Sequence, residues 1–199
     1  MATNSVISTI PIEKYVDLLR QMPASAFEDV PRIEEWARLH PVDPTTIERY
    51  LCWDRQHYTR NLIDHTDLYD LIALCWDIGH VSSIHNHRGQ NCWMSVPVGR
   101  LMVQNYRVIS ENVEAHTCEI VPTDSLVMNA ERPCGVNPEH PVHAVFNPRE
   151  FDQRAVSLHI YSRPFDSCVV YSDAQGTCGE IQLRFTTEYG EPVPRAQRS

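Results

Sequence analysis

Short β-rich segments recur at regular spacing from residue 70 to residue 187, and this pattern constrains the fold more than any other feature of the sequence. Turn residues separate the segments, and the chain contains 14 prolines and 7 glycines. Such spacing indicates an all-β sandwich or barrel and not alternating β-α-β units. The predicted strands are DLIALCW (70–76), SSIHNH (82–87), NCWMSVPV (91–98), LMVQNYRVI (101–109), HTCEIVP (116–122), SLVMN (125–129), VHAVFN (142–147), RAVSLHIYS (154–162), CVVYS (168–172) and IQLRFTT (181–187).

Helical patterns occupy the N-terminal part of the chain. Residues 12–22 place their apolar side chains near one helical face, and Pro23 ends the pattern. Residues 31–39 have the pattern of a second helix. Residues 43–51 begin with a capping aspartate and a proline at the first helical position, so they predict a third.

The chain of 199 residues is long enough for one domain with its own core. We expect a single mainly β domain, a small barrel preceded by α-helices. In this interpretation residues 1–55 are the helical segment, residues 56–190 the barrel and residues 191–199 a flexible tail.

The composition argues against several classes of protein. No apolar run reaches the roughly 20 residues that a membrane span requires, and the N-terminus lacks a signal-peptide pattern, so we expect a cytoplasmic protein. A net charge of −9 would repel a phosphate backbone, which argues against nucleic acid as a partner. The 7 cysteines form no Cys-x-x-Cys pair, and we expect most of them to be buried, reduced thiols in a monomeric protein.

Polar residues occupy one whole face of the predicted strand at 154–162. Ser157, His159 and Tyr161 share that face, and aliphatic residues share the other. If the aliphatic face packs on neighbouring elements, the polar face must point into the barrel. Three polar groups facing a core require mutual hydrogen bonds or a ligand, so the choice is between a polar core network and a site.

The segment at 82–87 contains two histidines at alternate positions. His85 and His87 would project from one face of a strand, within reach of a single ion. For an isolated His-x-His, two exposed histidines on a surface strand are the simpler interpretation. The residues around His85 and His87 favour a metal site over two exposed histidines.

The region resembles the metal-binding motifs of the cupin superfamily. Part of the second motif, a histidine and an asparagine separated by three residues, is matched by His143 and Asn147. Most metal-binding cupins carry a fourth, glutamate ligand where this chain has Cys92, and a cysteine there resembles the thiol dioxygenases, which hold iron with three neutral histidines. The first motif is matched by Gly79, His85, His87, Cys92 and Gly99.

This resemblance implies that His85, His87 and His143 bind Fe²⁺. His140 lies close to His143 but is followed by proline and fits the motif less well. A three-histidine Fe²⁺ centre keeps its full charge and three open positions, so that a substrate thiolate and amine can bind while O2 takes the last one. The remaining histidines are expected to be solvated side chains: His40, His57, His65, His80 and His116.

Further segments between about residues 58 and 189 resemble the cysteine dioxygenase family, namely 58–62, 74–76, 82–87, Cys92 and 155–162. The family implies the oxidation of L-cysteine by O2 to cysteine sulfinic acid.

Roles for individual residues follow from the same resemblance. Arg60 would clamp the substrate carboxylate, with Tyr58 lining the pocket, although an arginine at a surface salt bridge is the plain alternative. Tyr161 would direct its phenol toward the oxygen or sulfur bound at the iron, and His159 and Ser157 would orient that phenol.

Two cysteines and one arginine also bear on the resemblance to the cysteine dioxygenase family. Cys92 resembles the family cysteine that forms a thioether with the active-site tyrosine, here Tyr161; its alternative is a small buried apolar residue. Cys168 resembles a cysteine near the substrate entrance, and we assign it no role. Where the family has Ser-Pro-Pro-Phe-Asp, the chain has Arg163 in the second position, which is similar to the 3-mercaptopropionate dioxygenases. Arg163 could place a second cation at the pocket rim or could point to solvent.

The favoured hypothesis is therefore an iron-dependent cysteine dioxygenase that uses a small thiol amino acid and O2. A dioxygenase of 3-mercaptopropionate or mercaptosuccinate is the first alternative. A zinc or manganese cupin isomerase or hydrolase and a non-catalytic cupin binding or storage protein are the others.

Overall fold

The computed structural model describes residues 8–136 and 141–194. No helix among these residues is long and apolar enough to span a membrane. The helices are α1 (Ile12–Arg20) and α2 (Val30–Leu39), with short 3₁₀ helices at Ala24–Glu28, Pro44–Thr46, Glu48–Tyr50 and Arg149–Phe151. The strands are β1 (Thr59–His65), β2 (Asp70–Trp76), β3 (Ile84–His85), β4 (Asn91–Val98), β5 (Leu101–Asn112), β6 (Thr117–Met128), β7 (Cys134–Gly135), β8 (Val142–Phe146), β9 (Ala155–Ser162), β10 (Ser167–Ser172), β11 (Thr177–Gln182), β12 (Thr187–Glu188) and β13 (Glu191–Pro192).

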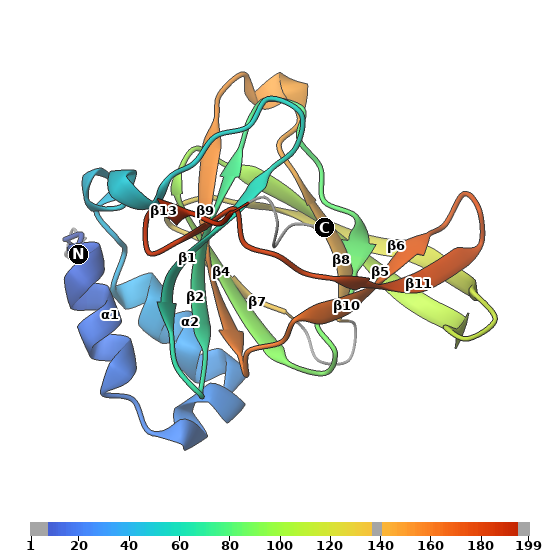
Figure 1. Cartoon of the computed structure of the whole chain (residues 1–199), viewed down its shortest axis with the longest axis horizontal. Coiled ribbons are helices and arrows are strands. Elements are labelled where there is room, and N and C mark those ends of the chain that lie inside the picture. The colour runs from blue at the N-terminus through green and yellow to red at the C-terminus, as the bar shows by residue number, and fades with distance from the viewer. Residues whose placement is uncertain (1–7, 137–140, 195–199) are drawn as a thin grey trace, which may run out of the picture.

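The strands form two sheets that pack on a common interior. One has the order β13-β12-β1-β2-β9-β4-β7 and the other the order β11-β10-β3-β8-β5-β6. Leu74 and Met94 from the first sheet meet Val103 and Val145 from the second in this interior. Figure 1 shows the hairpins β5-β6 and β10-β11 extending away from the helices. The mainly β fold with N-terminal helices that the sequence predicts is confirmed.

Helices α1 and α2 cover the outer face of the larger sheet (Figure 1). Ile12 of α1 and Ile33 of α2 belong to the same apolar cluster as Leu71 of β2 and Leu158 of β9. Tyr161, on the opposite face of β9, belongs to the interior cluster instead. The prediction that β9 turns its aliphatic face outward and its polar face into the barrel is confirmed, as are both helices.

The helix predicted at 43–51 is wrong. Two short 3₁₀ helices, Pro44–Thr46 and Glu48–Tyr50, occupy this stretch. Asp43 does cap the first of them, since its Oδ1 accepts a hydrogen bond from the Thr45 amide at 3.0 Å. A cap and an N-terminal proline favour the first turn of either helix type, and they do not decide whether the next turn follows.

Several strands differ from the prediction. The strand predicted at 82–87 is limited to β3, Ile84–His85, and His87 lies beyond its end. The sequence does not predict β1, because Arg60, Asn61 and Asp64 interrupt its apolar pattern, and β1 is instead stabilised by pairing with β2 and β12. The strands predicted at 116–122 and 125–129 form one strand, β6, which contains Pro122. Because β6 lies at the edge of its sheet, the proline is tolerated there.

The predicted strand at 181–187 is divided into the end of β11 and the start of β12. Residues 183–186 lie between them outside any strand, and we call this connection the 183–186 strap. The Thr186 amide donates a hydrogen bond of 2.6 Å to the Arg60 carbonyl. The strap therefore lies beside β1 at Arg60.

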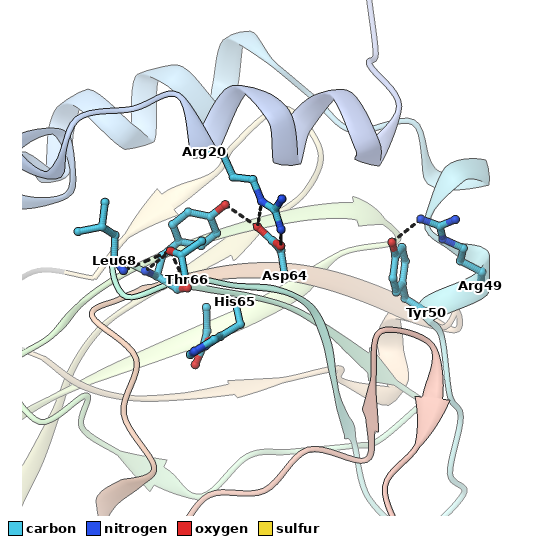
Figure 2. Close-up of polar contacts among 9 residues, drawn as sticks. Arg20, Arg49, Tyr50, Asp64, His65, Thr66 and Leu68 are labelled. Carbon is cyan, nitrogen blue, oxygen red and sulfur yellow. Dashed lines mark hydrogen bonds and ion pairs between the residues drawn. The ribbon is translucent and has the colours of Figure 1, made fainter.

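A buried carboxylate joins α1 to the larger sheet. Figure 2 shows Arg20 reaching from α1 to Asp64 on β1, where its Nε and Nη2 donate to the carboxylate at 3.1 and 2.5 Å. The Tyr69 hydroxyl donates to the same carboxylate at 2.6 Å, and Asp64 is only 3% exposed. Burial and this hydrogen bond raise the pKa of Tyr69, so its phenol remains a donor at neutral pH.

We expect Tyr69→Phe to lower the free energy of unfolding by about 1.5–3 kcal/mol, because a buried carboxylate loses one of its donors. Urea denaturation followed by circular dichroism measures this. Tyr50→Phe is a matched control, since the Tyr50 hydroxyl accepts from Arg49 at 2.5 Å near the surface (Figure 2) and should matter less. If Tyr69→Phe and Tyr50→Phe lowered the free energy of unfolding equally, the hydrogen bond from Tyr69 to the buried Asp64 carboxylate would not be the cause of the loss.

Candidate metal centre and substrate pocket

Three histidines, from β3, from the loop that follows it and from β8, converge on one point. His85 ends β3, His87 follows two residues later, and His143 of β8 lies directly opposite His85. The ring centroids are 5.2 Å apart for His85 and His87 and 4.9 Å apart for each of the other two pairs. One nitrogen from each ring lies within 4.8 Å of the other two, so all three could bind one metal ion. The weaker candidate, His140, lies outside the described residues.

The state of these imidazoles suits metal binding. Burial lowers the pKa of His85 to about 4 and holds the pKa of His87 and of His143 well below the usual range, so all three are neutral at physiological pH. His85 Nδ1 lies 2.8 Å from the Ser83 carbonyl oxygen and donates to it, which leaves Nε2 for a metal. Both His87 nitrogens are buried and have no hydrogen-bond partner among the described residues, and a metal would satisfy one of them.

The polar face of β9 forms a continuous hydrogen-bonded chain. Trp76 Nε1 donates to Ser157 Oγ at 2.9 Å, and Ser157 Oγ lies 2.8 Å from His159 Nε2. His159 Nδ1 in turn lies 3.2 Å from the Tyr161 hydroxyl. Burial lowers the pKa of His159 to about 3 and raises the pKa of Tyr161, so both groups are neutral. The chain ends at the metal site, because the Tyr161 ring lies 5.5 Å from the His87 ring.

Cys92 and Tyr161 are cross-strand neighbours. They are paired in the register of β4 and β9, which places side chains on the same face in contact range. Both are buried, with exposures of 0% and 4%. Burial raises the pKa of the Cys92 thiol well above its usual value, so the thiol is protonated.

A small cavity of about 30 Å³ opens beside the histidines. Among the described residues that line it, Arg60 is the one permanently charged side chain, and none is a carboxylate. Tyr58 forms part of the wall, with its ring stacked on Trp76 at 4.6 Å between centroids. Cys168 and Phe165 also line the cavity. The cavity thus offers one cation to a small ligand.

Arg60 is held by aromatic rings and retains hydrogen-bonding capacity. Its Cζ lies 5.7 Å from the Tyr161 ring centroid and 5.8 Å from that of Phe185, in the 183–186 strap. Its Nε is buried without a hydrogen-bond partner among the described residues. A buried donor without an acceptor is costly, and a planar carboxylate would satisfy it.

Arg163 lies apart from this group. It is exposed and does not line the cavity, and its backbone amide donates to Gln90 Oε1 at 2.8 Å. The expectation that the other histidines are solvated is wrong for His80, which is 7% exposed and accepts a hydrogen bond from the Asp77 amide at 2.9 Å. His65 is also engaged, with Nδ1 2.6 Å from Asp70 Oδ1.

Sequence reasoning assigned no role to Trp76 or Phe165. Trp76 starts the hydrogen-bonded chain, and strand alternation could have found it, because Leu74 and Trp76 share the inward face of β2. The Phe165 ring lies 6.1 Å from His87 and 5.1 Å from Tyr161. It follows β9 in a loop, where no periodicity indicates the direction of a side chain.

The sequence is similar to a known protein family over most of its length. Residues 1–174 match the family model described as cysteine dioxygenase type I. The chain belongs to the cysteine dioxygenase type I family. Human cysteine dioxygenase type 1 is 27% identical over 197 residues, which cover 98% of this chain and 96% of the human protein. The Danio rerio protein of that name is 27% identical over 195 residues, covering 98% of this chain and 95% of its own length.

Solved structures with lower similarity include a cupin superfamily protein from Desulfitobacterium hafniense. It has a TM-score of 0.36 and 13% identity, and the alignment covers 57% of this family member and 84% of that protein. A hydroquinone 1,2-dioxygenase solved with Cd²⁺ has a TM-score of 0.42 and 10% identity, covering 56% of this chain and 68% of that one.

Proposed function

We propose that this protein is an iron-dependent thiol dioxygenase that converts L-cysteine and O2 to cysteine sulfinic acid. The observation that carries the proposal is a cluster of three neutral histidines that could hold one metal ion, two of which, His85 and His87, line a small cavity together with a single cation, Arg60. Family membership supports it, since the curated relatives are named cysteine dioxygenase. Fe²⁺ at His85, His87 and His143 would supply a Lewis acid and redox centre for the thiol and O2. Because RSH and O2 together give RSO2H, both oxygen atoms remain in the product and no external reductant is required.

Arg60 binds the substrate carboxylate in this proposal. Its unpartnered Nε and the aromatic rings around its guanidinium leave a preorganised donor at the pocket. Tyr58 limits the width of the pocket, because its ring is fixed by stacking on Trp76. A small molecule whose carboxylate binds Arg60 would have its thiol near His85 and His87, which line the same cavity.

The series of hydrogen bonds along β9, from Trp76 to Tyr161, keeps the Tyr161 hydroxyl proton directed into the pocket. Since Trp76 donates to Ser157 Oγ, Ser157 can donate its own proton to His159 Nε2, and His159 then carries its proton on Nδ1. His159 Nδ1–H donates to the Tyr161 oxygen, which leaves the phenol proton free to hydrogen-bond the reacting atoms. The raised pKa of Tyr161 keeps that proton in place.

The charges of the pocket favour a monocarboxylic thiol. The second carboxylate of mercaptosuccinate would require another cation, and Arg163 does not line the cavity. No lining carboxylate is present to bind an ammonium group, so we propose that the cysteine amine enters as a neutral metal ligand. An amine-free thiol such as 3-mercaptopropionate is the competing substrate.

Oxygen consumption by iron-loaded protein with L-cysteine, 3-mercaptopropionate and mercaptosuccinate tests the function. We expect the highest kcat/KM with L-cysteine and one O2 consumed per sulfinate formed. Metal analysis of the purified protein separates this from a zinc or manganese cupin isomerase or hydrolase. Protein that contains zinc, and that consumes no O2 with any thiol after iron loading, would exclude a dioxygenase.

We expect a Cys92–Tyr161 thioether in part of the active protein. The bond replaces the S–H of Cys92 and one ring C–H of Tyr161, and O2 accepts the two hydrogens. The cross-strand pairing of the two residues supports this expectation. Intact mass should decrease by two hydrogens during turnover, and Cys92→Ala should reduce turnover without abolishing it. An unchanged mass after extended turnover would contradict the link.

A further inference from the structure

His87 differs from His85 in how its ring is held. The Ser83 carbonyl fixes the His85 ring, whereas neither nitrogen of His87 has a hydrogen-bond partner among the described residues. Metal-binding histidines usually gain their orientation from such a second hydrogen bond. The orientation of His87 must therefore come from its backbone and from ring packing against His143, Tyr161 and Phe165.

Asn86 controls the backbone on both sides of His87. Its Oδ1 accepts from the Arg88 amide at 3.3 Å, which closes a turn around His87, and from the Val169 amide of β10 at 3.1 Å. The Asn86 backbone amide donates to the Val169 carbonyl oxygen at 3.1 Å. Arg88 has φ of 54°, a left-handed conformation that a non-glycine residue keeps only when its surroundings impose it. The hydrogen bonds that the Asn86 side chain accepts therefore stabilise the turn that contains His87.

The Tyr171 phenol and the Glu111 carboxylate continue the hydrogen bonding from the Asn86 side chain. Asn86 Nδ2 donates to the Tyr171 hydroxyl at 3.1 Å, and that hydroxyl donates to Glu111 Oε2 at the end of β5. The direction of donation is fixed along the whole series, because the amide offers only N–H there and the carboxylate only accepts. Tyr171 is 7% exposed, so its hydroxyl is largely removed from competing water.

We propose that Asn86, Tyr171 and Glu111 are positioning residues that set the direction of the His87 ring toward the bound metal. The three act through the turn at His87 and do not touch the substrate. The inference rests on the metal centre of the proposed function, and it holds whichever thiol is the substrate.

Titration of the metal-free protein with Co²⁺ tests the proposal through the dissociation constant and the visible absorption of the bound ion. Tyr171→Phe and Glu111→Ala should each weaken Co²⁺ binding about two- to tenfold, as expected for one lost hydrogen bond, and should change the absorption band shape. Glu111→Gln should keep both near wild type, because its amide oxygen still accepts from Tyr171. Glu111 is exposed, so its variants should fold.

Tyr106→Phe is the matched control. Tyr106 packs in the same apolar cluster as Tyr171 and has no hydrogen bond to Asn86 in the described part of the chain. Equal changes in Tyr106→Phe and Tyr171→Phe would indicate general loosening and overturn the proposal. So would wild-type binding and spectra in both Tyr171→Phe and Glu111→Ala, or a Glu111→Gln variant as weak as Glu111→Ala. If His143→Ala bound Co²⁺ as tightly as wild type, the metal centre and hence the proposed function would fail first.

Discussion

Replacing His143 with alanine is expected to remove most bound iron and all thiol-dependent O2 consumption. His143 supplies one of the three ligands in the proposed centre, and His85, His87 and His143 are the one group of candidate metal ligands found in the described part of the chain. Loss of one of three ligands leaves two imidazoles, which hold Fe²⁺ weakly. Iron content by elemental analysis and O2 uptake with L-cysteine measure the two effects. His85→Ala and His87→Ala should behave in the same way.

His40→Ala is the control for these variants. His40 lies at the end of α2, where its Nδ1 is 2.8 Å from the Trp36 carbonyl oxygen, away from the three histidines. It should retain iron and turnover. If His143→Ala kept its iron while His140→Ala lost it, the third ligand would be His140 and the assignment would be wrong.

Arg60→Ala is expected to lower kcat/KM for L-cysteine by about ten- to a hundredfold, mainly through a higher KM. The loss of a charge-assisted bidentate contact corresponds to about 1.5–3 kcal/mol. Arg60→Lys keeps the charge but not the planar fork, so it should fall between wild type and alanine. Steady-state kinetics with L-cysteine give all three values.

Arg163→Ala provides the comparison for Arg60. Because Arg163 is exposed and does not line the cavity, its removal should change kcat/KM much less than the removal of Arg60. The cysteine assignment would fail if an amine-free thiol exceeded L-cysteine tenfold and Arg163→Ala abolished that preference. A thiol dioxygenase reaction would remain in that case.

The features that the sequence predicted well are those encoded over a few residues. The inward face of β9 follows from strict alternation. His85 and His87 converge as their spacing suggested, but only Ile84–His85 is strand and His87 lies in the turn that follows. The pairing of His85 with His143 required the family resemblance, because the register between β3 and β8 is set by sheet assembly.

The features that could not be predicted depend on contacts between distant segments. β1 carries an unfavourable apolar pattern and forms because β2 and β12 pair with it. The reach of Tyr171 to Asn86 and the position of the 183–186 strap beside Arg60 are likewise products of packing. The predicted helix at 43–51 failed for the opposite reason, since its local capping signals fit a short 3₁₀ turn equally well.

The parallel pairing of β1 with β12 has a consequence for biosynthesis. Arg60 is bordered by β12 and by Thr186, whose amide donates to its carbonyl, and both belong to the last part of the chain. Because a ribosome releases the chain from its N-terminus, the metal ligands emerge well before the segment that encloses Arg60. A nascent or prematurely terminated chain ending before Leu183 would contain all three histidines, yet it would lack Leu183, which lines the cavity, and Phe185, whose ring packs against Arg60.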